Sequence, residues 1–246
     1  MKKHLYILVA AVLVIGSCHT LDLNPLSEPS TGNFYSNATE LTIAVNDLYR
    51  IDFIGNDLED YSDNYWNRAT GGNAVTYGTM ASDDGTVLTY WTNCYKAIAR
   101  ANTILASLDR ARENTAPSVL TGIEAQARFA RAYQYSRLIT HFGDVPFLSS
   151  TISLDSAYQY TRMSEDSILQ FVFSELDYAA ENLPATYSAS EDQRWTKGAA
   201  LAIKARTALY MGQWAIAAEA AHGVMDLAAQ GVYALYPSFR DLFLSP

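Results

Sequence analysis

Two helical segments near the end of the chain, joined by a very short turn, restrict its fold more than any other feature. Residues 196–211 and 214–229 both carry apolar side chains at helical spacing, and only Gly212 and Gln213 separate them. Small residues recur where such helices would touch, beside a turn glycine and a turn aromatic: Ala205, Ala208, Gly212, Trp214, Ala217 and Ala221. This arrangement is typical of a tetratricopeptide repeat, although any tight helical hairpin favours alanine and glycine.

Four more segments carry apolar residues at helical spacing, and we expect each of them to form a helix. They begin at Asn37, at Thr89, at about Gly122 and at Ser164, and the last two end near His141 and residue 182. Asn37 can cap its helix, with Glu40 three residues later as the acid of a capping box. Ser164 suits a helix start and Gly143 a helix end. The sequence therefore predicts a mostly α-helical protein with tetratricopeptide-like hairpins.

Residues 52–88 differ from the rest, because neither a helical nor a strand period persists through them. Loops of this length are uncommon and usually functional or disordered, and the many aromatic residues argue against disorder. One stretch, DYSDNYWNR at residues 60–68, combines aromatic rings with Asp, Asn and Arg side chains. Aromatic faces can stack on the C–H face of a pyranose while such polar groups bind its hydroxyls. We therefore expect long irregular loops, and the composition of this stretch would suit sugar binding.

The first residues have the layout of a bacterial lipoprotein leader. Lys2 and Lys3 form a basic start, residues 5–15 are apolar, and small residues ending at Ser17 come directly before Cys18. Such a short apolar run spans only about half of a bilayer core, so it is not a membrane-spanning helix. The cysteine is the expected lipidation site, because two acyl chains on one residue give stable membrane attachment. The alternative is a secretory leader with a cysteine in that place by chance.

The chain divides into three expected parts. Residues 1–17 would be the signal peptide. Residues 18–36 hold prolines and turn formers without periodicity, as expected of a lipidated tether. Residues 37–246 would form the helical domain.

Composition narrows the possible partners. Without residues 1–17 the chain keeps 15 basic and 26 acidic residues, a formal charge of −11. An acidic chain without a basic run argues against nucleic acid and against electrostatic binding to anionic lipid. The chain has two cysteines, so once Cys18 is acylated Cys94 has no partner, and we expect no disulfide framework.

The sequence carries none of the common motifs for catalysis, cofactors or metals. G-x-S-x-G, P-loop, H-E-x-x-H and dinucleotide fingerprints are absent, and the histidines show no paired metal spacing. We therefore expect no enzyme activity, no cofactor and no metal site. Polar and aromatic residues on the helices have expected structural roles: Trp91 and Trp214 in the core, Asn102 bonded to backbone groups, and Arg131 in an ion pair.

Several motifs occur in a fixed order along the chain. After Cys18 come LDLNP at 21–25, NFY at 33–35, Ser62-Asp63, EAQARFARAYQY at 124–135, HFGDVP at 141–146, Leu183-Pro184, RWTKGAA at 194–200 and YALYP at 233–237. As an ordered series they resemble the N-terminal half of the SusD/RagB family of outer-membrane nutrient-binding lipoproteins. Members of that family are about twice as long, so the resemblance covers only their N-terminal module.

The resemblance implies a function and a set of ligand residues. It implies a lipoprotein on the outer face of the outer membrane, which delivers oligosaccharides, or sometimes peptides, to a SusC-like TonB-dependent transporter beneath it. In this family the stretch after a Ser/Thr-Asp pair contributes an aromatic residue to the glycan cradle. Since Ser62-Asp63 is the matching pair, the expected ligand residues are Asp63, Tyr65, Trp66, Asn67 and Arg68.

Three alternatives remain open at this point. Trp66 can instead be buried and serve only to anchor its loop. The whole protein can be a helical-repeat lipoprotein that binds protein rather than glycan, which buried Tyr65 and Trp66 would favour. A surface glycoside hydrolase is a third possibility, and it requires two carboxyl groups that face one cleft.

Overall fold

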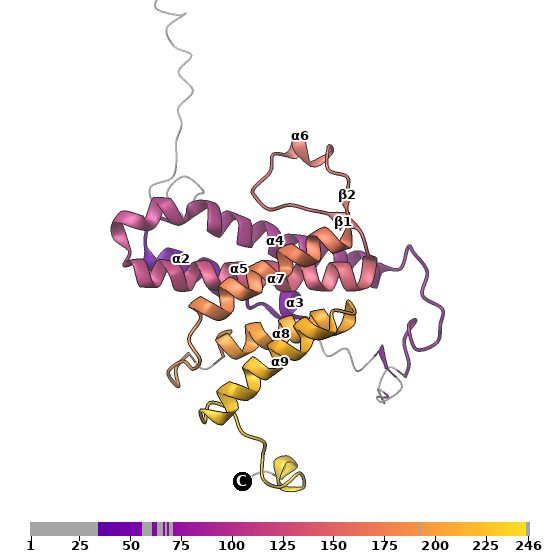
Figure 1. Cartoon of the computed structure of the whole chain (residues 1–246). Coiled ribbons are helices and arrows are strands. Elements are labelled where there is room, and N and C mark those ends of the chain that lie inside the picture. The colour runs from indigo at the N-terminus through magenta and orange to yellow at the C-terminus, as the bar shows by residue number, and fades with distance from the viewer. Residues whose placement is uncertain are drawn as a thin grey trace, which may run out of the picture. The chain divides into compact units, whose positions relative to one another are not determined.

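The computed structural model describes residues 34–55, 61, 62, 66, 68, 71–191 and 193–244. The described residues from Tyr35 onward form one compact unit, which consists mostly of helices (Figure 1). The elements are α2 (Ala38–Asp47), α3 (Ile51–Ile54), α4 (Gly85–Ala111), the 3-10 helix η2 (Arg112–Asn114), α5 (Pro117–Phe142), β1 (Val145–Pro146), α6 (Leu154–Ala157), β2 (Arg162–Met163), α7 (Glu165–Asn182), α8 (Lys197–Tyr210), α9 (Trp214–Ala229) and η3 (Asp241–Phe243). The predicted mostly helical fold is confirmed. In the described part of the chain, no helix is long and apolar enough to cross a bilayer.

The first of these helices, α2, begins as its sequence predicts. The side chain of Asn37 accepts a hydrogen bond from the backbone N–H of Glu40 at 3.1 Å. In return, the Glu40 carboxylate accepts one from the backbone N–H of Ser36 at 2.7 Å, which holds the pKa of Glu40 below its usual value. Asn37 is therefore the expected cap, while the return bond of Glu40 goes to the residue before the cap rather than to the cap itself, as it would in a standard capping box. Leu41 and Val45 are fully buried, because this face of α2 packs on α4 and α5.

The centre of the fold is α5, which forms an antiparallel hairpin with α4. Pro117 opens α5, and Gly143 follows its last residue with a φ of +65°, a backbone conformation that favours glycine. Side chains on all sides of α5 are buried, since it packs against α2, α4, α7 and α8. Its buried alanines allow this close approach: Ala125, Ala127, Ala130 and Ala132.

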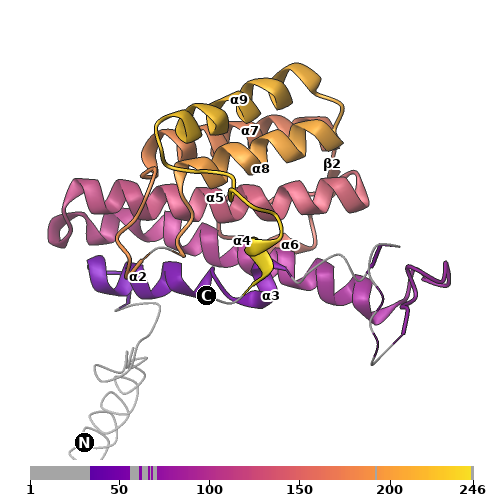
Figure 2. The ribbon, with the colours of Figure 1, turned by 90° about the horizontal axis from the view of Figure 1, so that it is seen from below.

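Three helices, α7, α8 and α9, lie on the side of α5 away from α2 (Figure 2). In that stack α7 packs on α5, α8 on α7 and α9 on α8. The turn between α8 and α9 contains Gly212 at a φ of +70°, and Ala208 and Ala217 are buried where the two helices meet. The predicted pair over 196–211 and 214–229 is thus confirmed as a tight hairpin. Ser164 caps α7, also as expected.

Three details differ from the expectations, the first being that α5 begins at Pro117 rather than at about Gly122. α4 begins at Gly85 rather than Thr89, because the Asp84 side chain accepts a hydrogen bond from the backbone N–H of Thr86 at 2.7 Å and so caps the helix. Trp214 is 68% exposed, so its expected place in the core is wrong. It is the first residue of α9, which is the outermost helix of the stack and packs mainly on α8. Trp91, by contrast, packs partly buried against the core as expected.

The described residues form two clusters of buried apolar side chains. One lies mainly between α5 and α7, and the other joins α2 to α4 and the first half of α5. Trp195, in the loop before α8, packs against both clusters. Its ring stacks on Tyr49 at 3.9 Å and on Phe129 at 4.7 Å between ring centroids. Trp195 therefore connects the two parts of the core.

A buried ion pair links α5 to α7. The Arg131 guanidinium donates to Glu175 from Nε at 2.9 Å and from Nη2 at 2.6 Å, and both residues are buried. Its Nη1 donates to Asn102 Oδ1 and to the Ser149 carbonyl, while the Asn102 amide donates to two further carbonyls of the same segment. The expected structural roles of Asn102 and Arg131 are confirmed. The network fixes the loop between β1 and β2, which form a short antiparallel pair.

Candidate functional site

The expected glycan residues lie partly within the structure. Trp66 is 67% exposed and Arg68 is also exposed, so Trp66 is not the buried loop anchor of the alternative interpretation. Other expected residues lie outside the described residues: Cys18, Asp63, Tyr65 and Asn67.

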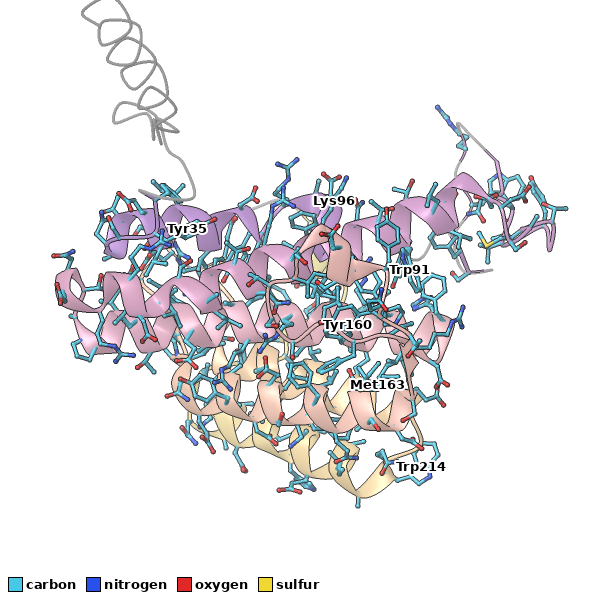
Figure 3. The ribbon with its side chains drawn as sticks, turned by 90° about the horizontal axis from the view of Figure 1, so that it is seen from above. Tyr35, Trp91, Lys96, Tyr160, Met163 and Trp214 are labelled. Carbon is cyan, nitrogen blue, oxygen red and sulfur yellow. The ribbon has the colours of Figure 1, made fainter. Side chains whose placement is uncertain are left out.

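A cavity of about 660 Å³ opens beside the start of α4, where α4 meets α3 and the second half of α5. It draws residues from the predicted loop and from the helices around it: Asp52, Tyr61, Asp84, Tyr90, Asn93 and Arg137. A cavity of this size is in the range of small-molecule sites. Figure 3 shows the side chains of this region, with Trp91 on α4 and the loop that leads into the helix extending beyond it.

Arg137 is held in place by several contacts along one side of the cavity. Its Nη1 donates to the Phe53 carbonyl at 2.8 Å, and its Nε donates to the Tyr90 hydroxyl at 3.1 Å. The guanidinium also lies over the Tyr90 ring at 4.4 Å, within the range of a cation–π contact. Gly55 leaves room for it, since a Cβ there would lie 3.1 Å from Nη2 and the φ of +95° favours glycine. The cavity thus contains a fixed positive charge.

Tyr90 and His141 form the next part of the wall. Burial raises the pKa of Tyr90 to about 12, so its hydroxyl keeps its proton at neutral pH and can donate it to a ligand. His141 Nδ1 lies 2.8 Å from the Arg137 carbonyl, which can only accept, so Nδ1 carries a proton. The Nε2 atom is therefore the ring nitrogen left for a ligand. The centroids of the Tyr90 and His141 rings are 4.9 Å apart.

A second cavity, of about 370 Å³, adjoins the first and is lined mainly by apolar side chains. The two cavities share Tyr61, Thr86 and Tyr90, and the second also contains Val75, Met80, His141 and Phe142. The loop beside it is stabilised by the Tyr77 hydroxyl, which accepts a hydrogen bond from the Gly72 backbone N–H at 3.0 Å. The Trp66 ring lies near Tyr77 in this loop, since a Cβ on Gly71 would contact both side chains. The aromatic residues that line the second cavity are Tyr61, Tyr90, His141 and Phe142.

The two joined cavities offer the groups that carbohydrate recognition needs. Tyr61 and Tyr90 contribute aromatic rings to the walls, Asp52 and Asp84 contribute acceptors, and Arg137 contributes a positive charge. Among the described residues, no group of three or more His, Cys, Asp or Glu side chains could hold a metal ion. The arrangement fits non-covalent binding of a polar ring with hydroxyl groups.

Sequence reasoning missed three of these residues. Tyr61 and the loop aromatics stood out by composition, but Tyr90, Arg137 and His141 lie on predicted helices and gave no signal of their own. The spacing of Arg137 and His141, one helical turn apart near the end of α5, is the signal that could have indicated a shared face.

Comparisons with known proteins identify relatives over most of the chain. The family model SusD-like_3, described as starch-binding and associating with the outer membrane, matches residues 21–209. The SusD-like protein P2 of Formosa agariphila is 27% identical over 260 residues, which cover 99% of this chain and 50% of the relative. A SusD-like protein of Bacteroides ovatus is 24% identical and covers 94% of this chain and 43% of its own length. The chain spans about half the length of the curated relatives it matches.

Solved structures show the same fold. A SusD-like carbohydrate-binding protein from Bacteroides fragilis superposes with a TM-score of 0.69 at 28% identity, over 79% of this chain and 41% of that protein. A SusD homologue from Bacteroides thetaiotaomicron has the same TM-score at 21% identity and covers 86% of this chain and 44% of its own.

Proposed function

Because this chain belongs to the SusD-like family, we propose that it is a cell-surface lipoprotein that binds an oligosaccharide or polysaccharide. One observation carries the proposal: the aromatic-lined pair of cavities at the start of α4, with fixed donors and acceptors in the same walls. The protein would deliver its ligand to a SusC-like TonB-dependent transporter of the outer membrane. Flat rings orient the sugar, and the charged and amide groups select its hydroxyls.

The carboxyl groups of the cavity support binding rather than hydrolysis. A glycoside hydrolase needs a carboxyl group with a raised pKa to protonate the leaving oxygen. Hydrogen bonds from Thr86 instead hold the pKa of Asp84 below its usual value, because Asp84 caps α4. Asp52 forms an ion pair with the Arg50 guanidinium at 3.5 Å. We therefore propose a protein without enzyme activity.

The glycan role of Trp66 is tested by replacing it with alanine. We expect Trp66→Ala to weaken binding of the preferred polysaccharide about tenfold, because the exposed indole supplies a stacking face. The measurement is affinity electrophoresis in gels containing soluble starch, xylan, mannan, pectin or laminarin, followed by calorimetry. Tyr158→Ala is the matched control, since Tyr158 is an aromatic residue that is 83% exposed and lies on a different segment, between α6 and β2. Unchanged affinity in Trp66→Ala would remove this residue from the site.

In this proposal, both the attachment to the membrane and the recovery of the transporter depend on acylation of Cys18. We expect the unchanged protein to incorporate labelled fatty acid and to co-purify with a TonB-dependent transporter from detergent-solubilised outer membranes. The Cys18→Ser variant should lose both the label and the membrane retention, because no thiol remains to be acylated. A variant that stays on the membrane with full transporter recovery would contradict the lipid anchor.

A protein-binding role is the second candidate, favoured by one observation. The segment after α9 exposes large apolar side chains, among them Leu235, Phe239 and Phe243. Apolar side chains that gather on a surface often mark a protein contact. The glycan panel separates the two candidates, since a protein that only binds other proteins should migrate unchanged in every gel.

A further inference from the structure

A third cavity continues the candidate site across the end of the helical stack. It has a volume of about 450 Å³ and is lined by Thr140, His141, Glu165, Tyr210 and Met211, among others. His141 also lines the second cavity, which in turn shares Tyr61 and Tyr90 with the first. The three cavities thus form a series, because each shares lining residues with the next.

We propose that this series is one extended binding surface for a glycan chain of several sugar units, with Tyr210 as the stacking residue of a distal subsite. The inference rests on the proposed glycan-binding function and adds the length of the ligand to it. A ligand that fills only the first two cavities would leave the third unused, whereas a longer chain passes His141 and reaches Tyr210.

Tyr210 has the exposure and the setting that such a subsite needs. It is the last residue of α8 and is 68% exposed, so one face of its ring is available to a ligand. Polar groups lie around it, as sugar hydroxyls require: the Glu165 carboxylate from the start of α7, and the Thr140 hydroxyl from the end of α5. A Cβ on Gly143 would lie 3.4 Å from Glu165 Oε2, so the absence of a side chain at Gly143 leaves room for that carboxylate.

His141 suits a position between two subsites. Contact with the Arg137 carbonyl orients its ring through Nδ1, and the remaining nitrogen can bond a hydroxyl of the passing chain. In Figure 3, Trp91 on α4 and Trp214 at the start of α9 lie toward the same end of the helices. Tyr210 directly precedes the turn to α9, so the distal subsite lies at that end too.

The test compares a short and a long ligand on the full chain. For starch as the panel glycan, calorimetry is run with maltotriose and with maltoheptaose. We expect the unchanged protein to bind the longer ligand more tightly. Tyr210→Ala should remove that advantage, with a loss of about tenfold for maltoheptaose and no change for maltotriose. Trp66→Ala should weaken both ligands, and Tyr158→Ala neither. If another panel glycan binds best, its trisaccharide and heptasaccharide replace these probes.

The outcomes distinguish the extended site from the proposed function. Equal affinity for short and long ligands, or a Tyr210→Ala variant that keeps the advantage of the longer one, overturns the extended site and leaves glycan binding intact. An unchanged protein that binds no glycan of the panel contradicts the proposed function, and the extended site fails with it. Thermal unfolding of Tyr210→Ala, monitored by circular dichroism, should match that of the unchanged protein because the side chain is exposed.

Discussion

Replacing Arg131 by methionine should lower the free energy of unfolding by about 3–5 kcal/mol, the usual cost of removing one partner of a buried ion pair. The Glu175 side chain is only 4% exposed, and Arg131 supplies its two shortest hydrogen bonds. Without Arg131, Glu175 keeps the contact with Arg128 at 3.3 Å. The Ser149 carbonyl and Asn102 Oδ1 also lose their donor. Urea unfolding followed by circular dichroism measures the loss.

Two variants test whether the uncompensated charge of Glu175 causes the loss of stability in Arg131→Met. Arg128→Met should cost much less, because Arg128 is about a third exposed and Glu175 keeps its bonds to Arg131. The double variant Arg131→Met with Glu175→Met should recover part of the loss, since it removes the buried charge as well. A double variant less stable than the sum of its single changes would mean that Arg131 stabilises the fold by another route.

Replacing Trp195 by alanine should cost about 3 kcal/mol, because the side chain packs against both core clusters. The change removes the stacked contacts with Tyr49 and Phe129 and leaves a cavity between α2 and α5. The Trp195 backbone N–H donates to the Tyr49 hydroxyl at 3.0 Å, so loss of the ring also loosens the loop that carries it. The measurement is again the free energy of unfolding in urea.

The same substitution at Trp214 serves as the matched control for Trp195. Trp214 is 68% exposed at the start of α9, so its truncation should change the free energy of unfolding by about 0.5 kcal/mol or less. Equal losses at the two positions would mean that Trp214 is covered in solution and that the contrast in burial does not govern stability.

The helices could be predicted because their signals are local. The caps at Asn37 and Ser164, and the turn with Gly212, depend on residues a few positions apart, and the structure places helix ends there. Trp214 shows the limit of such reasoning. Its place in a repeat pattern indicated packing, but burial depends on which element covers the helix, and α9 lies on the outside of the stack.

The candidate site could be predicted only in part, for a related reason. The loop around residues 60–68 was visible through its composition, and Trp66 is exposed as a ligand residue would be. Arg137 and His141 lie far from that loop in the sequence, on a helix whose pattern indicates core packing. The fold brings Arg137 to the cavity, where its guanidinium donates hydrogen bonds to the Phe53 carbonyl and the Tyr90 hydroxyl. No local sequence pattern encodes these contacts.

The length of α4 determines how far the cavities lie from the point where the chain enters the helical unit. At about 1.5 Å per residue its 27 residues extend about 40 Å. The cavities lie at its first turns, whereas Asn114, just past its last turn, donates to the Ser36 carbonyl where the chain enters the domain. In Figure 3, Tyr35 lies toward the opposite end of the helices from Trp91, which is in the first turns of α4. The point where the chain enters the helical unit and the cavities therefore lie at opposite ends of α4, about 40 Å apart along its axis.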